Sequence, residues 1–255
     1  MINQLNWNQI KVLSSAGIKA RYRKTLIGFF WVILSPVLMY SVQAFVFQKV
    51  LKIELDNYPL FLLGGLLPWI FISFTWDTST SCLINSSSLL KGIQISPLTI
   101  LCSAILDNFI NFITSFLLIL VPVLFYSQVI SLHLLFLPVA LIFILLFTLF
   151  STGILSVLYV FYRDIKYVTS FGMSLLFFLT PIFYPASFVP EKYQILLSFN
   201  PIYIIISPFR ASIYGDANTL ELTFMLLKSG ALVVLSYLLL TGIWNQKKNE
   251  LYLKI

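Results

Sequence analysis

The stretch from Asn108 to Tyr162 contains 55 residues and, apart from His133, no side chain that can carry a charge near neutral pH. As a single helix it would be about 80 Å long, because an α-helix rises roughly 1.5 Å per residue. The hydrocarbon core of a bilayer is only about 30 Å thick and needs about 20 apolar residues to cross it. The stretch therefore predicts two antiparallel membrane spans that turn at the polar residues "YSQVIS" (126–131).

The composition also indicates a membrane protein. Hydrophobic residues make up 59% of the 255 positions and charged residues only 10%, which is too little charge to cover a soluble surface. The formal net charge of +7 would suggest a nucleic-acid partner if the basic residues clustered on a soluble domain. They lie between apolar runs instead, so we interpret them as a membrane-topology signal. Neither Cys82 nor Cys102 has a spacing typical of a disulfide framework or a metal site.

Further uncharged runs lie between Lys24 and Lys49 and between Asp56 and Asp77. Each is long enough for one span. In the last predicted span, 224–244, Lys228 is close enough to one end for its side chain to reach the membrane interface. We therefore predict a single domain (1–255), an all-α integral membrane protein with six transmembrane helices. The predicted spans are 25–48, 57–76, 105–126, 133–162, 167–184 and 224–244.

The segment from Pro185 to Glu221 is apolar enough to suggest a seventh span. Three prolines, at positions 190, 201 and 208, interrupt the segment, and Glu191 and Lys192 add charge to it. Proline breaks helices, and short helical pieces within a membrane are tolerated where protein or a water-filled cavity surrounds them. We therefore expect two short helices that dip into the membrane or lie along its surface.

The distribution of basic residues orients this six-span arrangement. With the N-terminus in the cytoplasm, 11 of the 16 lysines and arginines fall on the cytoplasmic face, as the positive-inside rule requires. A seventh span would move the three lysines near the C-terminus to the outside. The eleven cytoplasmic residues are Lys11, Lys19, Arg21, Arg23, Lys24, Lys91, Arg163, Lys166, Lys247, Lys248 and Lys254; the outer face keeps Lys49, Lys52, Lys192, Arg210 and Lys228.

The N-terminal segment 1–24 has an amphipathic pattern. Apolar or small residues recur at helical spacing, while Lys11, Ser15 and Lys19 occupy another face. Such a basic helix is typical of the cytoplasmic headgroup region, and the alternative is an irregular solvated tail. The residues that carry this interfacial prediction are Trp7, Ile10, Leu13 and Gly17 on one face and Lys19, Arg21, Arg23 and Lys24 among the cations.

Catalytic motifs are not found in the sequence. It has no G-x-x-x-x-G-K-[ST] loop to hold ATP phosphates, and no cluster of His, Cys and carboxylate residues with metal-ligand spacing. The ionisable residues within or near spans two to four are Asp77, Asp107 and His133, and they do not converge on one centre as acid–base catalysis requires. For both aspartates we favour a structural or interfacial role over proton relay, so we expect neither an enzyme nor a cofactor in this chain.

Charges interrupt the apolar sequence at Arg163, Asp164 and Lys166. A buried ion site, a catalytic pair and a loop in water are the three possible explanations. The charge distribution favours the loop, at the cytoplasmic turn between spans four and five. There Arg163 follows the end of one helix and Asp164 precedes the next, which suits both helix dipoles.

Aromatic residues form 16% of the chain. Many are expected in interfacial belts and helix packing, but some could line a conduit in which flat rings contact sugar rings. The candidates for such a lining are Phe29, Phe30 and Trp31 in span one and Phe177, Phe178, Phe183 and Tyr184 at the end of span five.

Six short motifs occur in a specific order over nearly the whole chain. They are "RYRKTLIGFFWVILSPVLM" (21–39), "LLPWIFIS" (66–73), "SSSLLKGIQISPLTIL" (86–101), "FYRDI" (161–165), "TPIFYP" (180–185) and "NPIYIIISPFR" (200–210). In this order the chain resembles the membrane, or permease, subunits of ABC transporters that export polysaccharides, namely O-antigen, group 2 capsule and teichoic acid.

The resemblance implies a homodimer of permeases with two copies of a separate cytoplasmic ATPase, which binds ATP and Mg. It implies a channel at the dimer interface that carries a lipid-linked glycan, with O-antigen favoured, across the inner membrane, and both termini in the cytoplasm. It further implies a coupling loop at 85–97 and external gate helices at 185–214. The residues implied in contact with the ATPase are Asn85, Ser88, Leu89, Leu90, Lys91, Ile95, Pro97, Arg163 and Asp164.

Three alternatives stay open from the sequence. A drug or lipid export permease of the same transporter class would share the six spans. A membrane-embedded glycan-modifying enzyme would need an essential intramembrane carboxylate. A secondary transporter is disfavoured, because the two halves show no internal repeat.

Overall fold

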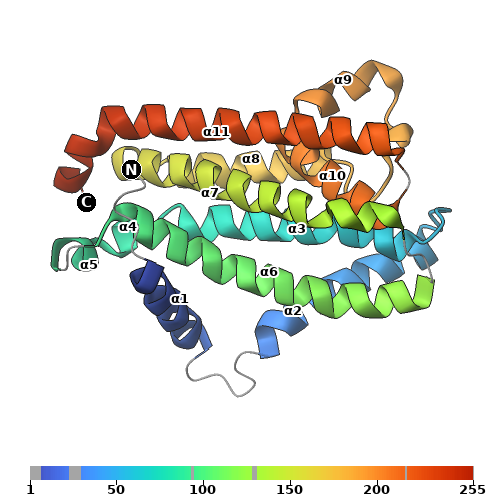
Figure 1. Ribbon diagram of the computed structural model, residues 1–255, viewed down its shortest axis with the longest axis horizontal. Coiled ribbons are helices and arrows are strands. Elements are labelled where there is room, and N and C mark those ends of the chain that lie inside the picture. Colours follow the sequence, from blue (N-terminus) through green and yellow to red (C-terminus); the bar gives the residue numbers. More distant parts are fainter. Residues whose placement is uncertain (1–6, 23–29, 93–94, 128–130, 216, 255) are drawn as a thin grey trace.

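The computed structural model describes residues 7–22, 30–92, 95–127, 131–215 and 217–254 (Figure 1). Within these ranges every regular element is a helix, so the predicted all-α class is confirmed. The longest helices run alongside one another as a bundle, with α1 oblique to α6 (Figure 1). They are α3 (Tyr58–Ser79), α6 (Pro97–Ser127), α7 (Leu137–Phe161), which continues the 3-10 turn Leu132–Phe136, and α11 (Thr219–Lys254).

Helix α3 lies at the centre of the bundle. It is apolar on all its faces, the pattern of a helix that is covered on every side, and it packs against α2, α6, α7 and α10. The pair Gly64 and Gly65 allows α10 to come close, because a Cβ atom at Gly64 would lie 2.8 Å from the Cα of Arg210. This close approach makes α10 part of the core.

The structure contains four helices that are long and apolar enough to cross a membrane, or five if the bent pair α9–α10 is counted as one. The first predicted span is described from Phe30 onward, as α2 (Phe30–Phe45) followed by the π-helical turn Val46–Val50. The fifth predicted span corresponds to α8 (Ile165–Leu179), which has 15 residues. The count of six spans therefore remains a prediction.

Helix ends differ from the predicted ends where local capping chemistry acts. Helix α8 ends at Leu179, not at residue 184, because Thr180 precedes a proline and takes an extended conformation. Helix α6 begins at Pro97, eight positions earlier than predicted: the Ser96 hydroxyl accepts from the Thr99 amide at 3.2 Å, and proline suits the first helical position. Helix α11 (Thr219–Lys254) extends beyond the predicted span 224–244 at both ends. The prediction covered only the apolar part of the helix, and the polar residues on either side continue the same helix.

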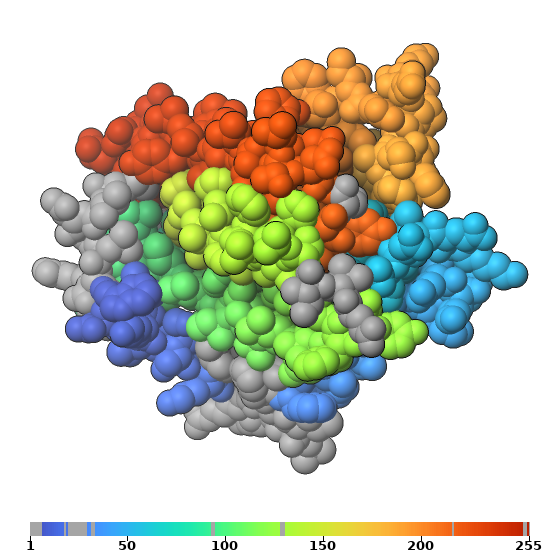
Figure 2. All heavy atoms as spheres, turned by 45° about the vertical axis from the view of Figure 1, so that its right-hand side comes forward, coloured from blue at the N-terminus to red at the C-terminus, as the bar shows by residue number. Residues whose placement is uncertain are grey.

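The proline-rich segment forms two helices, α9 (Glu191–Phe199) and α10 (Pro201–Tyr214), bent by 95°, after a 3-10 turn at Ala186–Phe188. Asn200 stands at the bend and accepts hydrogen bonds from the amides of Ile202 and Tyr203, which caps α10. Helix α10 dips into the bundle, where Ile205 and Phe209 are fully buried. Helix α9 belongs to a part of the chain that projects from the bundle (Figure 2).

Helix α1 (Trp7–Tyr22) is confirmed as a helix and packs against α6. Ile10 and Ser14 are buried on its inner face, and the Ser14 hydroxyl donates to the Asp107 carboxylate of α6. Lys11 and Lys19 are exposed on the other face. This arrangement agrees with the amphipathic pattern and gives Asp107 a structural contact; the position of α1 at a membrane surface stays a prediction.

One end of the bundle gathers the segments predicted to be cytoplasmic. Helices α4 (Cys82–Asn85) and α5 (Ser87–Gly92), the turn between α7 and α8 and the end of α11 all lie there (Figure 1). The ammonium groups of Lys247 and Lys254 each lie 4.9 Å from the ring centroid of Phe161. These basic residues thus share one end of the molecule, as the charge distribution predicts.

Candidate functional site

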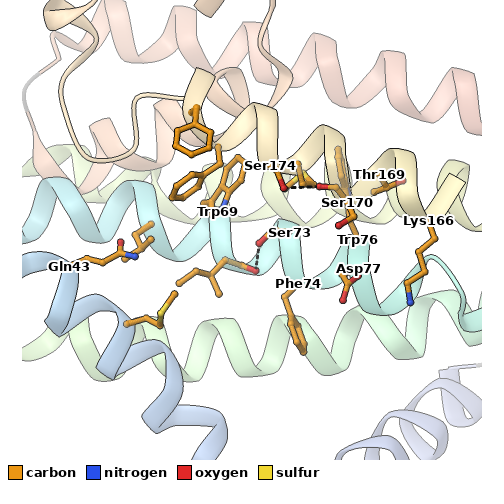
Figure 3. A pocket seen from close by; sticks show the side chains of 16 residues that line it. Gln43, Trp69, Ser73, Phe74, Trp76, Asp77, Lys166, Thr169, Ser170 and Ser174 are labelled. Carbon is orange, nitrogen blue, oxygen red and sulfur yellow. Dashed lines mark hydrogen bonds between the residues drawn. The ribbon is translucent and has the colours of Figure 1, made fainter. Parts of the chain in front are cut away.

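A groove with a volume of about 560 Å³ lies between α2, α3 and α8 (Figure 3). It extends along α8 from Lys166 to Phe178, about 18 Å at 1.5 Å per residue. Its two ends differ in chemistry, and hydroxyl groups lie between them. The lining residues are Met39 and Gln43 from α2, Leu66, Trp69, Ile70, Ser73, Phe74, Trp76 and Asp77 from α3, and Lys166, Thr169, Ser170, Met173, Ser174, Phe177 and Phe178 from α8.

Aromatic rings form the end of the groove nearest the α8–α9 loop. The Trp69 and Phe177 ring centroids are 5.5 Å apart, and Phe177 makes edge contacts at 5.5 Å with both Phe178 and Phe183. Phe183 in turn stacks on Phe47 at 4.4 Å, with the planes 3° apart. Aromatic groups from four segments (α3, α8, the loop after α8 and the π-helical turn Val46–Val50) therefore meet at this end.

Charges mark the opposite end, where Asp77 of α3 and Lys166 of α8 are both exposed (Figure 3). Between the ends, the Ser73 hydroxyl donates to the Ile70 carbonyl at 3.2 Å and the Ser174 hydroxyl to the Ser170 carbonyl at 3.1 Å. Each hydroxyl oxygen keeps lone pairs that can accept a hydrogen bond.

Gln43 adds a further polar group to the groove wall (Figure 3). Its Oε1 atom is buried and has no hydrogen-bond partner among the residues that the structure describes. A buried acceptor of this kind gains stability from a donor that enters the groove. The groove thus combines ring faces with hydrogen-bonding groups along its length.

The structure brings together three of the predicted channel-lining residues, namely Phe177, Phe178 and Phe183. Trp31 lines a different cavity, between α2, α3 and α6. Phe30 is 55% exposed, and Tyr184 is half-buried outside the groove lining. Phe29 lies outside the described residues.

Sequence reasoning did not identify Trp69, Trp76 or Gln43 as groove residues. Trp69 lies in the motif "LLPWIFIS" (66–73), so the motif was a signal that could have drawn attention to it. The face it presents depends on how α3 packs against α8, which a single sequence does not reveal.

The groove opens on a strongly apolar, exposed face. On α8, Tyr167 and Phe178 are each 77% exposed and Phe171 is 67% exposed; on α2, Val42 and Phe45 are 60% and 63% exposed. Exposed apolar side chains in such number are typical of contact with lipid or with another protein.

The segment predicted to couple to a partner lies at the charged end of the bundle. Ser88, Leu89 and Lys91 of α5 are exposed, whereas Leu90 is buried in a small core with Trp244. The remaining predicted contact residues of this loop are Asn85, which is exposed, Ile95, which is half-buried, and Pro97, which is buried.

Arg163 and Asp164 lie in the turn between α7 and α8 and are both exposed. The Arg163 guanidinium lies 5.2 Å from the ring centroid of Tyr159, and Asp164 occupies the N-cap position of α8. Both residues are therefore exposed in a turn between two helices, and the position of this turn in the cytoplasm stays a prediction.

Arg210 corrects the sequence interpretation, which placed it among the outer-face cations. It is buried in the bundle, donates to the carbonyls of Pro181 at 2.8 Å and Ile182 at 3.4 Å, and lies 4.3 Å from the ring centroid of Phe61. Gly65 makes room for it, because a side chain there would overlap the guanidinium. Arg210 fixes the loop that follows α8 against α3.

The interfacial prediction falls partly on described residues. Trp7 is 59% exposed and lines a small cavity against α6 and α7, and Lys19 is exposed. The Arg21 side chain, Arg23 and Lys24 lie outside the described residues. Across the described ranges, no three His, Cys, Asp or Glu residues are grouped as metal ligands.

Residues 8–214 match the family described as ABC-2 type transporter. The O-antigen export system permease protein RfbA of Myxococcus xanthus is 32% identical over 199 residues, which cover 77% of this chain and 76% of that protein. A protein of the same name from Klebsiella pneumoniae is 28% identical, over 78% of this chain and 77% of its own length.

A more distant relative is the polysialic acid transport protein KpsM of Escherichia coli, which is 24% identical over 80% of each chain. The family match covers most of the helical bundle, the groove included, and accounts for its apolar helices. This chain belongs to the ABC-2 type transporter family and is a multi-pass membrane protein.

Proposed function

We propose that this chain is the permease subunit of an ATP-driven exporter that moves a lipid-linked polysaccharide, with O-antigen favoured, out of the cytoplasm across the inner membrane. The observation that carries the proposal is the similarity to an O-antigen export permease over 77% of the chain. A drug or lipid exporter and a membrane-embedded enzyme have no comparable support among the relatives.

The groove supplies chemistry that suits a glycan. Sugar rings have apolar faces that pack on aromatic side chains such as Trp69 and Phe177, and hydroxyls that bond to groups such as Gln43 and Ser73. These contacts are individually weak and repeated along the groove, so a chain of sugars can advance without one tight binding site. Asp77 and Lys166 stand at the proposed cytoplasmic end.

Two copies of the chain would close the groove. The apolar, exposed residues of α2 and α8 border it, and pairing these faces in a homodimer buries them and places two grooves against each other. The result is one channel with the aromatic groups at its proposed outer end and α9 outside it as a gate.

The energy would come from two copies of a separate cytoplasmic ATPase that binds ATP and Mg. Helix α5, with exposed Ser88, Leu89 and Lys91, and the turn with Arg163 and Asp164 lie at the same end of the bundle. Both termini are then cytoplasmic, and α1 lies in the headgroup layer of that leaflet.

A deletion strain tests the function. We expect loss of one surface glycan and accumulation of that glycan on its carrier lipid inside the cell, both restored by the wild-type gene. Loss of a capsular polysaccharide, not of O-antigen, would overturn the preference for O-antigen as the cargo. An unchanged surface, or a purified complex without an ATPase subunit, would contradict the proposal.

A further inference from the structure

A second cavity, of about 230 Å³, lies between α2, α3 and α6. Ile70 and Phe74 of α3 line both this cavity and the groove, so they form the wall between the two. The rest of its lining combines the aromatic residues Trp31, Phe71 and Phe112 with Pro36, Leu67 and the polar residues Ser35, Asn108, Asn111 and Ser115. The cavity thus has apolar walls with polar groups among them, and it is separate from the proposed glycan path.

Polar groups from α6 enter this apolar wall. Asn111 and Ser115, one helical turn apart, both line the cavity. The Asn111 Oδ1 and Ser115 Oγ atoms are buried and have no hydrogen-bond partner in the part of the chain that the structure describes. Ser115 is 1% exposed. Leaving such groups unpaired is costly, and they mark a position where a ligand supplies the missing partner.

The charge of the lining restricts the ligand. Neither Asp, Glu, Lys, Arg nor His is among the described residues of the cavity wall. A phosphate group would therefore meet no countercharge there, at a large desolvation cost. A neutral hydrogen-bonding group attached to a hydrocarbon chain fits both the apolar residues of the wall and its uncharged polar side chains, Asn111 and Ser115 among them.

The depth of the cavity indicates which neutral group is available. Asp107 receives the hydrogen bond from Ser14 of α1, which lies in the cytoplasmic headgroup layer if the orientation in the proposed function holds. Along α6, Asn111 and Ser115 are then roughly 6 and 12 Å deeper than Asp107. The ester carbonyls and upper acyl chains of phospholipids occupy this layer.

We propose that this cavity binds one acyl chain of an ester-linked phospholipid from the cytoplasmic leaflet. The Ser115 hydroxyl donates to the ester carbonyl, and a half-turn of the Asn111 carboxamide brings its NH2 group to the same oxygen. The chain packs against Trp31 and Phe112. A polyisoprenyl phosphate has no carboxylic ester carbonyl, and its phosphate group is charged, so it does not satisfy this site.

Wild-type protein gives the first test. The full-length chain is placed in nanodiscs with dioleoyl phosphatidylethanolamine or with its diether analogue, extracted into detergent, and analysed by native mass spectrometry for retained lipid. We expect about tenfold stronger retention of the diester, the equivalent of one or two intramembrane hydrogen bonds. Equal retention of both lipids, or displacement of the diester by a polyisoprenyl phosphate, would overturn the proposal.

Variants give the second test. The double variant Asn111→Leu with Ser115→Ala should lose the difference between diester and diether. Thr114→Ala is the matched control, because the Thr114 hydroxyl donates to the Ile110 carbonyl of its own helix at 2.8 Å, and it should keep the difference. A difference that survives in the double variant contradicts the site. If the double variant does not fold, the wild-type comparison decides alone.

These readouts do not depend on glycan export. Lipid retention can fail while a deletion strain still loses its surface glycan, and the reverse outcome is equally distinguishable. The lipid site takes its membrane orientation from the proposed function, but a failure of one can be told apart from a failure of the other.

Discussion

Arg210 is a buried cation whose partners are the main chain and an aromatic ring. Burying a charge is costly unless hydrogen bonds compensate for the lost water. Here the carbonyls of Pro181 and Ile182 and the ring of Phe61 provide that compensation. The sequence shows the arginine and the Gly64–Gly65 pair separately, but only the packing of α10 on α3 shows that one makes room for the other.

Replacing Arg210 with methionine should therefore destabilise the protein. The side chain keeps its bulk but leaves two carbonyls without donors, which we expect to lower the free energy of unfolding by about 2–4 kcal/mol. Thermal unfolding in detergent measures the change. Lys192→Met, which removes an exposed cation from α9, is the control and should have little effect. An equal loss in both variants would contradict the anchoring role.

Cys82 gives a prediction on reactivity. Burial raises the pKa of its thiol from 9.0 to about 12, so the thiol stays protonated and slow to alkylate at pH 8. We expect iodoacetamide to leave Cys82 unmodified in the native protein and to label a Ser88→Cys variant on the exposed α5. Peptide mass spectrometry reads both sites, and rapid native labelling of Cys82 would show that this core is open.

The raised pKa of the Cys82 thiol also makes the stability of the folded protein depend on pH. The unfolded thiol ionises near pH 9, whereas the folded thiol resists ionisation up to about pH 12. The contribution of the buried neutral thiol is thus complete below pH 9 and is lost as the pH rises through that window.

At the scale of elements, α1 is held to α6 by a close contact at Gly17. A methyl group added there would overlap a carboxylate oxygen of Asp107. We expect Gly17→Val to displace α1, at a cost of about 1–3 kcal/mol, and to raise hydrogen exchange in residues 7–22. Ala16→Val, on the exposed face, should leave exchange unchanged; similar exchange in both variants would count against the contact.

The turn between α7 and α8 gives a prediction on coupling. Arg163 and Asp164 are exposed at the end of the bundle that carries α5. We expect Arg163→Ala or Asp164→Ala to reduce export more than membrane insertion, because the insertion signal is spread over many other cations. Surface glycan and membrane-inserted protein are measured in the same cells. An equal decrease of both would make the turn a topology signal only.

Much of the element pattern follows from sequence, and the exceptions have local causes. Hydropathy predicts α3 and α7 nearly to their ends because lipid or protein core surrounds them. It places the end of α8 too late, since "TPIFYP" is apolar yet its prolines stop the helix. Of the residues predicted to line a channel, Phe177 and Phe178 line the groove, whereas Trp31 lines another cavity. Which residues of a helix face a neighbouring helix depends on how the two pack. Hydrophobic periodicity cannot predict that face where all sides of the helix are apolar.

For the whole molecule, the exposed face of α8 should become a contact between two copies. A Phe171→Cys variant should form a disulfide-linked dimer in membranes under mild oxidation, because its counterpart lies across the proposed interface. Leu235→Cys on α11, whose native side chain is 52% exposed, is the control and should stay monomeric on non-reducing gels. Cross-linking at Leu235 alone would place the interface on α11.

The hydrogen bonds that Arg210 donates to main-chain carbonyls have an evolutionary consequence. Every residue type offers the same carbonyl, so the arginine holds the loop after α8 whatever side chain stands at position 182. Substitutions in this loop can alter the shape and polarity of the aromatic end of the groove without releasing its backbone. Related transporters could in this way acquire new cargo by changing a few side chains, while the helical frame behind them is inherited intact.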